Sequence, residues 1–303
     1  MSGDAHPHAL LRPRVALPFL TISVIWGSTW WVITTQIASV PSEWSVTWRF
    51  ALATPAMFAL AFAMPGKVAM PARVHLLAIV VGICQFCGNY NFVYQAERHL
   101  TSGIVALMVG LMIVPNALLG RAVLKQPITS RFAIGSLIAI GGIALLLVNE
   151  ASEARVAGNV ELGVWLALGA MLAASVSNII QAIETGRRVP LFTLIAWSML
   201  YGTVCDAAPA FWLSGPPVVP SARDYWLGAA YLALAGSVVT FPLYYTLIRE
   251  IGAGRAAYHN VLVVIIAMLL STLLEGFHWS RLAIVGSALA LVGLLVALRA
   301  KSV

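Results

Sequence analysis

The sequence predicts an all-α membrane protein with ten transmembrane helices, arranged as two inverted five-helix repeats with both termini cytoplasmic. Its composition is 60% hydrophobic and only 10% charged, with a mean hydropathy of +0.90. So few charged side chains cannot cover a water-facing surface on 303 residues, which places the chain in a lipid bilayer. The segment Arg131-Phe-Ala-Ile-Gly-Ser resembles the later segment Arg281-Leu-Ala-Ile-Val-Gly-Ser, which predicts an internal duplication.

Ten apolar stretches approach the roughly 20 residues that a spanning helix needs. They are residues 15–37, 45–64, 74–95, 101–121, 132–148, 161–184, 191–213, 225–248, 255–274 and 281–299. Their continuous apolar character favours helices over the alternating strands of a β-barrel, because a helix satisfies its own backbone in lipid. The first stretch follows Arg12 and Arg14 like a signal peptide, but its polar middle and the Trp30-Trp31 pair favour a retained helix.

The basic residues predict the orientation, because short loops rich in Lys and Arg remain on the cytoplasmic side. When the loops are numbered alternately with both termini inside, most of the 18 basic residues fall inside and most acidic residues fall outside. Arg131 is then inside and Arg281 outside, so the two repeats must face opposite ways. Membrane orientation explains the net charge of +7 without a nucleic-acid partner.

The duplication also divides the chain into segments, with an acidic loop between the repeats. We expect a cytoplasmic tail at 1–14, a first repeat at 15–148, a periplasmic linker at 149–160, a second repeat at 161–299 and a cytoplasmic tail at 300–303. Glycines near the ends of the repeats are expected to permit close helix crossing between them. They include Gly135, Gly142, Gly286 and Gly293.

Several short motifs resemble one membrane family. They are Trp26-Gly-Ser-Thr-Trp in the first stretch, Arg49-Phe in the second, and Gln85-Phe-Cys-Gly-Asn-Tyr-Asn-Phe-Val-Tyr-Gln-Ala-Glu-Arg98 in the third. Together with the inverted halves they resemble the EamA type of the drug/metabolite transporter superfamily, and the third motif resembles bacterial aromatic amino-acid exporters. The chain departs from that pattern at Lys125, because members often carry an acid there that matches Glu275 in the ninth stretch.

The resemblance implies a fold and a function. Members of this kind are secondary transporters of the bacterial inner membrane that export amino acids and related metabolites. Their central cavity opens alternately to each side of the membrane. We therefore expect export of amino acids, both aromatic and other neutral ones, by alternating access.

Polar side chains form two stripes within the apolar stretches. Placing such side chains in lipid is unfavourable in free energy. Gln85 and Asn89 are four residues apart and share a helix face in the third stretch. Asn178, Gln181 and Glu184 step along one side of the sixth stretch. Carboxamides at such positions either join helices by hydrogen bonds or face a solute cavity, and two complete stripes favour the cavity.

Aromatic side chains supply the second component of a site for amphipathic solutes. Rings can stack on flat or apolar groups, and carboxamides can hold an ammonium and a carboxylate without a fixed counter-charge. The aromatic candidates for substrate binding, with one further carboxamide, are Trp26, Trp30, Tyr90, Tyr94, Trp165, Tyr244, Tyr258 and Asn260. Tryptophans near the ends of the stretches are better explained as an interfacial belt.

Two prolines and three titratable residues are candidates for roles in a transport cycle. Pro115 and Pro242 lie within apolar stretches and weaken the helix, so each is a candidate hinge or a static kink. Asp206, Glu184 and His259 are candidates for carrying a coupling proton. Transport down the solute gradient without a coupling ion is the alternative.

The remaining motifs predict no cofactor, no metal and no catalysis. Cys84 and Cys87 have the spacing of a redox motif, but they lie in an apolar stretch without a second cysteine pair or a histidine cluster. The sequence has no phosphate loop or hydrolase motif, so we do not expect an enzyme.

The partners that we expect are small-molecule substrates and the lipid bilayer of a bacterial inner membrane, around a chain that can act as a monomer. Two other functions fit the same pattern. One is a channel or sensor for small amphipathic solutes, and the other is an exporter of multiple drugs or cations.

Overall fold

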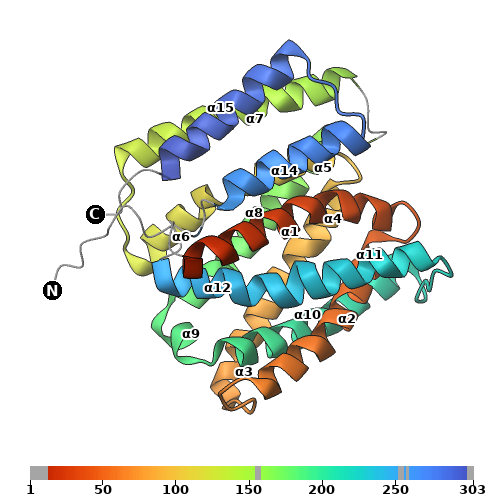
Figure 1. Cartoon of the computed structure of the whole chain (residues 1–303), viewed down its shortest axis with the longest axis vertical. Coiled ribbons are helices and arrows are strands. Elements are labelled where there is room, and N and C mark those ends of the chain that lie inside the picture. Colours follow the sequence, from red (N-terminus) through yellow and green to blue (C-terminus); the bar gives the residue numbers. More distant parts are fainter. Residues whose placement is uncertain (1–12, 154–157, 252–255, 257–258, 299–303) are drawn as a thin grey trace.

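The computed structural model describes residues 13–153, 158–251, 256 and 259–298. Within these residues every regular element is a helix and no strand occurs, which confirms the predicted all-α class. The elements, packed as one bundle in Figure 1, are α1 (Pro13–Ile37), α2 (Ser42–Ala63), α3 (Ala72–Val81), η2 (Gly82–Asn89), α4 (Tyr90–Ala96), α5 (Ser102–Gly110), α6 (Ile113–Leu124), α7 (Ser130–Glu153), α8 (Val160–Ala182), α9 (Glu184–Arg188), α10 (Leu191–Ser214), α11 (Arg223–Ala233), η3 (Leu234–Val239), α12 (Thr240–Ile251), α14 (His259–Leu274) and α15 (Arg281–Leu298).

Eight helical stretches of the described residues are long and apolar enough to cross a membrane, and two shorter apolar helices follow at His259–Leu274 and Arg281–Ala297. Each predicted apolar stretch overlaps one of these helices. The sixth ends at Ala182, earlier than predicted, because the backbone becomes extended at Ile183 before α9 begins. This is the pattern of a multi-pass membrane protein.

Two of the spans change from α-helix to π-helix in the middle. η2 interrupts the third span and η3 interrupts the eighth, at corresponding places in the two halves of the chain. Such turns occur frequently at functional sites. At η3, the carbonyl oxygen of Gly236 accepts hydrogen bonds from the side chains of Trp26, Arg49 and Thr240.

Helices α7 and α15 pack backbone to backbone through Gly135, Gly142, Gly286 and Gly293, which we call the glycine seam. A Cβ atom at Gly142 would lie only 2.4 Å from the backbone nitrogen of Ala290. The contacts advance along α7 as they recede along α15, so the two helices run antiparallel, side by side at the top of Figure 1. The prediction that these glycines permit a close crossing is confirmed, because small residues let helix backbones approach in a membrane.

The contacts between helices follow the same pattern in the two halves of the chain. α2 packs on α10, and α7 packs on α15. α1 packs on α14 and on the span formed by α11, η3 and α12. The corresponding helix of the second half, α8, packs on α5 and α6 and on the span formed by α3, η2 and α4. Exchanging the halves therefore reproduces the pattern of packing.

The two ends of the bundle differ in charge. Glu275 accepts a hydrogen bond of 3.1 Å from the backbone nitrogen of Ser102, the first residue of the fourth span. Lys125 follows the last residue of that span, so it lies at the opposite end of the bundle from Glu275. We call the end with Glu43, Glu97 and Glu275 the acidic end. The other, basic end carries Lys67, Arg73, Arg121, Lys125, Arg131, Arg187 and Arg188.

Candidate functional site

A cavity of about 100 Å³, which we call the central cavity, lies among helices from both halves of the chain. Its wall combines aromatic rings, carboxamides and aliphatic side chains. The lining residues are Trp26, Thr29, Trp30, Ile33, Arg49, Gln85, Asn89, Tyr90, Val93, Val109, Met112, Ala174, Asn178, Phe241, Tyr244, His259, Asn260 and Val263.

Most of the residues predicted to bind substrate meet in this cavity. They are Trp26, Trp30, Gln85, Asn89, Tyr90, Asn178, Tyr244 and Asn260. His259, a candidate proton carrier, also lines it. The cavity brings together parts of the two polar stripes and the central aromatic residues, while substrate binding itself stays a prediction.

The other predicted substrate-binding residues lie elsewhere. Tyr94 is buried beside the cavity, and its hydroxyl accepts a hydrogen bond from Arg49. Gln181 is buried near the C-terminal end of α8. Trp165 is 64% exposed and shares an exposed face of α8 with leucines, so the structure does not bring it into the cavity. Tyr258 lies outside the described residues.

Trp26 joins the two halves of the chain across the cavity. Its ring contacts those of Phe241, Tyr244 and His259 at centroid distances of 5.6, 5.1 and 5.3 Å. Its indole nitrogen donates a hydrogen bond of 3.1 Å to the carbonyl oxygen of Gly236 in η3. Because its polar edge is satisfied and three rings pack against it, this ring forms a fixed part of the wall.

The carboxamides both line the cavity and hold helices together. Gln85 donates to Oδ1 of Asn89 at 3.2 Å, and Asn89 donates to the carbonyl oxygen of Ala170 in α8 at 2.9 Å. Asn178 donates to Oδ1 of Asn116 at 3.4 Å. The two interpretations that the sequence left open, helix association and a cavity wall, therefore apply to the same side chains.

Arg49 lines the cavity, although the sequence did not mark it as a candidate site residue. Its side chain is 1% exposed. The guanidinium donates to the hydroxyls of Tyr94 and Ser237 at 3.3 and 3.2 Å, and to the carbonyl oxygen of Gly236 at 3.2 Å. It also lies 4.4 Å from the ring centroid of Tyr90. One feature of the sequence could have identified Arg49 as a site residue. It is a basic residue within an apolar stretch, which is unusual in lipid.

The candidate proton carriers occupy three different environments. Asp206 is fully buried in α10 and accepts a hydrogen bond of 2.7 Å from the side chain of Asn91, away from the cavity lining. His259 lines the cavity, and its Nδ1 lies 2.8 Å from the carbonyl oxygen of Ala256, to which it donates. Glu184 is exposed at the basic end. A coupling proton stays a prediction for all three residues.

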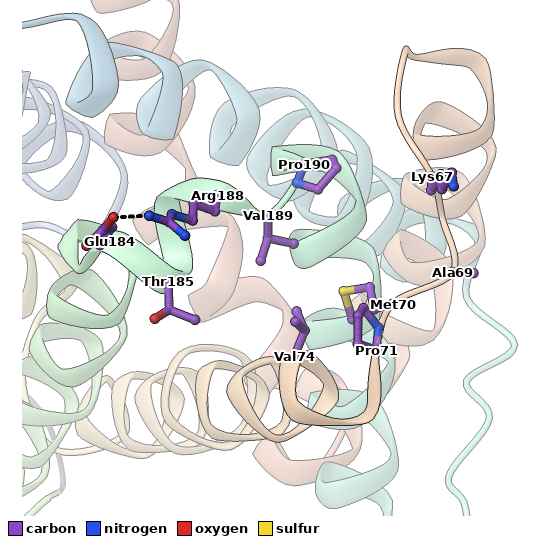
Figure 2. Close-up of a pocket in the computed structure, with 10 residues that line it drawn as sticks. All are labelled: Lys67, Ala69, Met70, Pro71, Val74, Glu184, Thr185, Arg188, Val189 and Pro190. Carbon is purple, nitrogen blue, oxygen red and sulfur yellow. Dashed lines mark hydrogen bonds and ion pairs between the residues drawn. The ribbon is translucent and has the colours of Figure 1, made fainter.

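Glu184 belongs to a second pocket, of about 580 Å³, at the basic end of the bundle. Figure 2 shows the residues that line it, which are Lys67, Ala69, Met70, Pro71, Val74, Glu184, Thr185, Arg188, Val189 and Pro190. Glu184 forms an ion pair with Arg188, and both side chains are exposed, so the pair contributes little to stability. Because most of this pocket's side chains face solvent at one end of the bundle, we take the smaller central cavity as the candidate site.

Glu97 is a buried acid at the acidic end that the sequence did not mark as a candidate. It follows the third span, and neither of its carboxylate oxygens has a hydrogen-bond partner among the described residues. Burial raises the pKa of Glu97 well above its usual range, and the nearby Glu275 carboxylate raises this pKa further, while Arg49 acts in the opposite direction. Glu97 therefore holds its proton more tightly than an exposed glutamate does.

Both candidate hinge prolines follow an irregular part of a helix. The α-helix of the fourth span is interrupted at Leu111 and Met112, about one turn before Pro115. η3 ends at Val239, three residues before Pro242. A proline lacks the N–H group that would close the preceding turn, which is a physical reason for an irregularity at each place. Motion at either proline stays a prediction.

Comparison with known proteins places the chain among membrane transporters. The uncharacterized inner membrane transporter YedA of Escherichia coli K12 is 27% identical over 309 residues, covering 94% of this chain and 93% of YedA. A probable amino-acid metabolite efflux pump of the same strain is 23% identical over 286 residues, covering 91% and 92%. Protein PagO of Salmonella typhimurium is 20% identical over 269 residues, covering 88% and 86%.

The fold and the family are shown by two further comparisons. A solved crystal structure superimposes with a TM-score of 0.68 at 19% identity, over 93% of this chain and 96% of its own chain, which shows a shared fold. The model of the EamA-like transporter family matches residues 14–148 and 161–299. These matches cover most of the sequence, and the chain belongs to the EamA-like transporter family.

Proposed function

We propose that this protein is a secondary transporter of a bacterial inner membrane that exports amino acids, aromatic ones included, and related metabolites. The observation that carries the proposal is one cavity, walled by aromatic rings and carboxamides, where helices of both halves meet. Rings stack on apolar side chains, and carboxamides hydrogen-bond the charged groups of an amino acid. The relative named a probable amino-acid metabolite efflux pump supports the same class of solute.

The two halves are, in this proposal, inverted repeats that rock about the central cavity. Three observations support the repeat. Exchanging the halves reproduces the packing of the helices, and η2 and η3 occupy corresponding places. α7 and α15, the last helices of the two family matches, run antiparallel. Equivalent helices of opposite direction are what an inverted duplication produces.

The size of the cavity supports one assignment of the structure to a state of the proposed cycle. Its volume of about 100 Å³ is below the roughly 300–1,000 Å³ of typical small-molecule pockets. An amino acid with a large side chain therefore needs a wider cavity. In our proposal the described conformation is closed around the site, and rocking of the halves widens the cavity toward one side at a time.

The alternatives differ from this proposal in observable ways. A channel or sensor could be built around the same helix-lined cavity, but a channel does not exchange solutes one for another. An exporter of cations is disfavoured by Arg49, because the cavity lining contains this buried positive charge and no carboxylate. Like charges repel strongly in an environment of low dielectric constant.

Solute counterflow in proteoliposomes tests the proposed function. Uptake of labelled L-phenylalanine should accelerate severalfold when the vesicles are preloaded with unlabelled L-phenylalanine or another neutral amino acid. Protein-free vesicles are the control, and an imposed pH gradient shows whether a proton is coupled. Uptake that is independent of preloading would indicate a channel, and no uptake of any amino acid in a panel would reject the solute class.

The proposed orientation places the basic end in the cytoplasm. Lys125 and His278 are exposed at opposite ends of the bundle, so each can carry a single cysteine in a background without Cys84, Cys87 and Cys205. A membrane-impermeant thiol reagent should label His278→Cys in intact cells from which the outer membrane has been removed. It should label Lys125→Cys only after the inner membrane is opened. Labelling of both variants from the outside contradicts the orientation.

A further inference from the structure

Arg49 brings a positive charge to the central cavity, and its hydrogen-bond partners are all uncharged. Its guanidinium donates to Tyr94, Ser237 and Gly236. Among the described residues no carboxylate forms an ion pair with it, the one ion pair there being that of Arg188 and Glu184. A buried charge without a carboxylate at ion-pair distance is unfavourable, so the site is electrostatically incomplete.

The wall of the cavity does not supply the missing negative charge. Its lining includes no aspartate and no glutamate. Glu97, the buried acid at the acidic end, interacts with Arg49 only at longer range, because it forms no ion pair with Arg49 among the described residues and does not line the cavity. The central cavity therefore has a net preference for an anionic group.

The guanidinium can also donate more hydrogen bonds than its present partners accept. Its contact with the hydroxyl of Tyr90 is 3.5 Å long, at the outer limit of a hydrogen bond. A guanidinium has five N–H groups, and its contacts with Tyr90, Tyr94, Ser237 and Gly236 leave one N–H without an acceptor among the described residues. A carboxylate that replaced the long contact would form charge-assisted bonds, which are shorter and stronger.

We propose that Arg49 is the counter-charge for a carboxylate of the transported solute. This inference rests on the proposed function and narrows its solute class to amino acids and other organic carboxylates. The cavity selects first for the anionic group and second for an apolar or aromatic side chain, which packs against Trp26 and Tyr244. The carboxamide oxygens of Gln85 and Asn260 are available in the same cavity for an ammonium group.

Two matched ligands test the proposal on the unaltered protein. 3-Phenylpropionate keeps the carboxylate of phenylalanine without its ammonium, and 2-phenylethylamine keeps the ammonium without the carboxylate. The readouts are thermal stabilisation of the purified protein and competition with L-phenylalanine counterflow. We expect 3-phenylpropionate to stabilise and compete, and 2-phenylethylamine at the same concentration to do neither. An equal effect of the two compounds, an effect of the amine alone, or no stabilisation by the acid overturns the proposal.

Variants of Arg49 add a second, independent test. Arg49→Gln should weaken binding of 3-phenylpropionate by about tenfold to a hundredfold, as expected for the loss of hydrogen bonds to a charged group. Arg49→Lys keeps the charge without the planar fork and should give an intermediate affinity. Arg223→Gln removes an exposed arginine at the start of α11 and should leave the affinity unchanged. Size-exclusion chromatography checks folding, and if Arg49→Gln does not fold, the ligand preference of the unaltered protein decides.

The proposed function and this inference fail in different ways. If L-phenylalanine shows no counterflow, but 3-phenylpropionate stabilises the unaltered protein and not Arg49→Gln, the carboxylate site stands and the amino-acid assignment falls. If L-phenylalanine shows counterflow, but 2-phenylethylamine competes as well as 3-phenylpropionate, the transport assignment stands and the role of Arg49 falls.

Discussion

Replacing Gly142 with leucine should destabilise the protein by about 3 kcal/mol or more, at the upper end of what overpacking costs. A Cβ atom at this position would lie 2.4 Å from the backbone nitrogen of Ala290 and 2.5 Å from the carbonyl oxygen of Gly286. Both neighbours are backbone atoms of α15, which cannot move aside by a change of rotamer. The expected result is a large drop in the unfolding midpoint in detergent and in the monodisperse fraction on size-exclusion chromatography.

Gly141 provides a matched control one residue away in the same helix. A Cβ atom there would meet no atom within 4 Å, because this side of α7 is exposed. Gly141→Leu should therefore leave the unfolding midpoint unchanged or raise it slightly, since leucine favours a helix over glycine by up to about 1 kcal/mol. Similar midpoints for the two variants would show that α7 and α15 do not pack as described.

Replacing Trp26 with alanine should lower the initial rate of L-phenylalanine counterflow by at least about tenfold. The substitution removes the ring that contacts Phe241, Tyr244 and His259 and leaves the carbonyl oxygen of Gly236 without its indole donor. Losing a buried aromatic side chain of this size also destabilises a protein by about 3–5 kcal/mol. The rate is therefore normalised to the amount of folded transporter in the vesicles, and Trp26→Phe should restore part of it.

Trp165→Ala is the control for this loss, since the same residue type is removed from a lipid-facing position. Its side chain is 64% exposed on α8 and does not line the cavity. We expect a rate within a factor of about two of the unaltered protein, in line with the small effects of most surface substitutions. If Trp165→Ala slows counterflow as much as Trp26→Ala does, the central cavity is not the site that limits transport.

The all-α class and the positions of the spans could be predicted because length and hydropathy are local properties of the chain. Every predicted apolar stretch overlaps an apolar helix. Local properties determine only in part where a helix is interrupted, because packing and backbone geometry contribute as well. Pro115 marked the fourth span as weakened, and the break lies about one turn before it, at Leu111 and Met112. The extended backbone at Ile183 was not predicted.

The residues of the candidate site could be predicted only in part, because a sequence gives the depth of a side chain in the membrane and not its direction. Trp26 and Trp165 both lie within their spans, yet one lines the cavity and the other faces outward. In the third span, η2 changes the phase of the helix, so a regular period of 3.6 residues cannot be carried through it. Arg49 was not assigned to the site because its partners come from helices that are distant in sequence.

The glycine seam constrains how this protein can change shape. Where two backbones touch directly, no side chains lie between them whose rotamers could absorb a sliding movement. We therefore expect α7 and α15, which lie together at one edge of the bundle (Figure 1), to move as one unit. In the proposed cycle, a motion that admits a solute bends or tilts the other helices relative to this pair, so we expect the two halves to stay joined along the glycine seam.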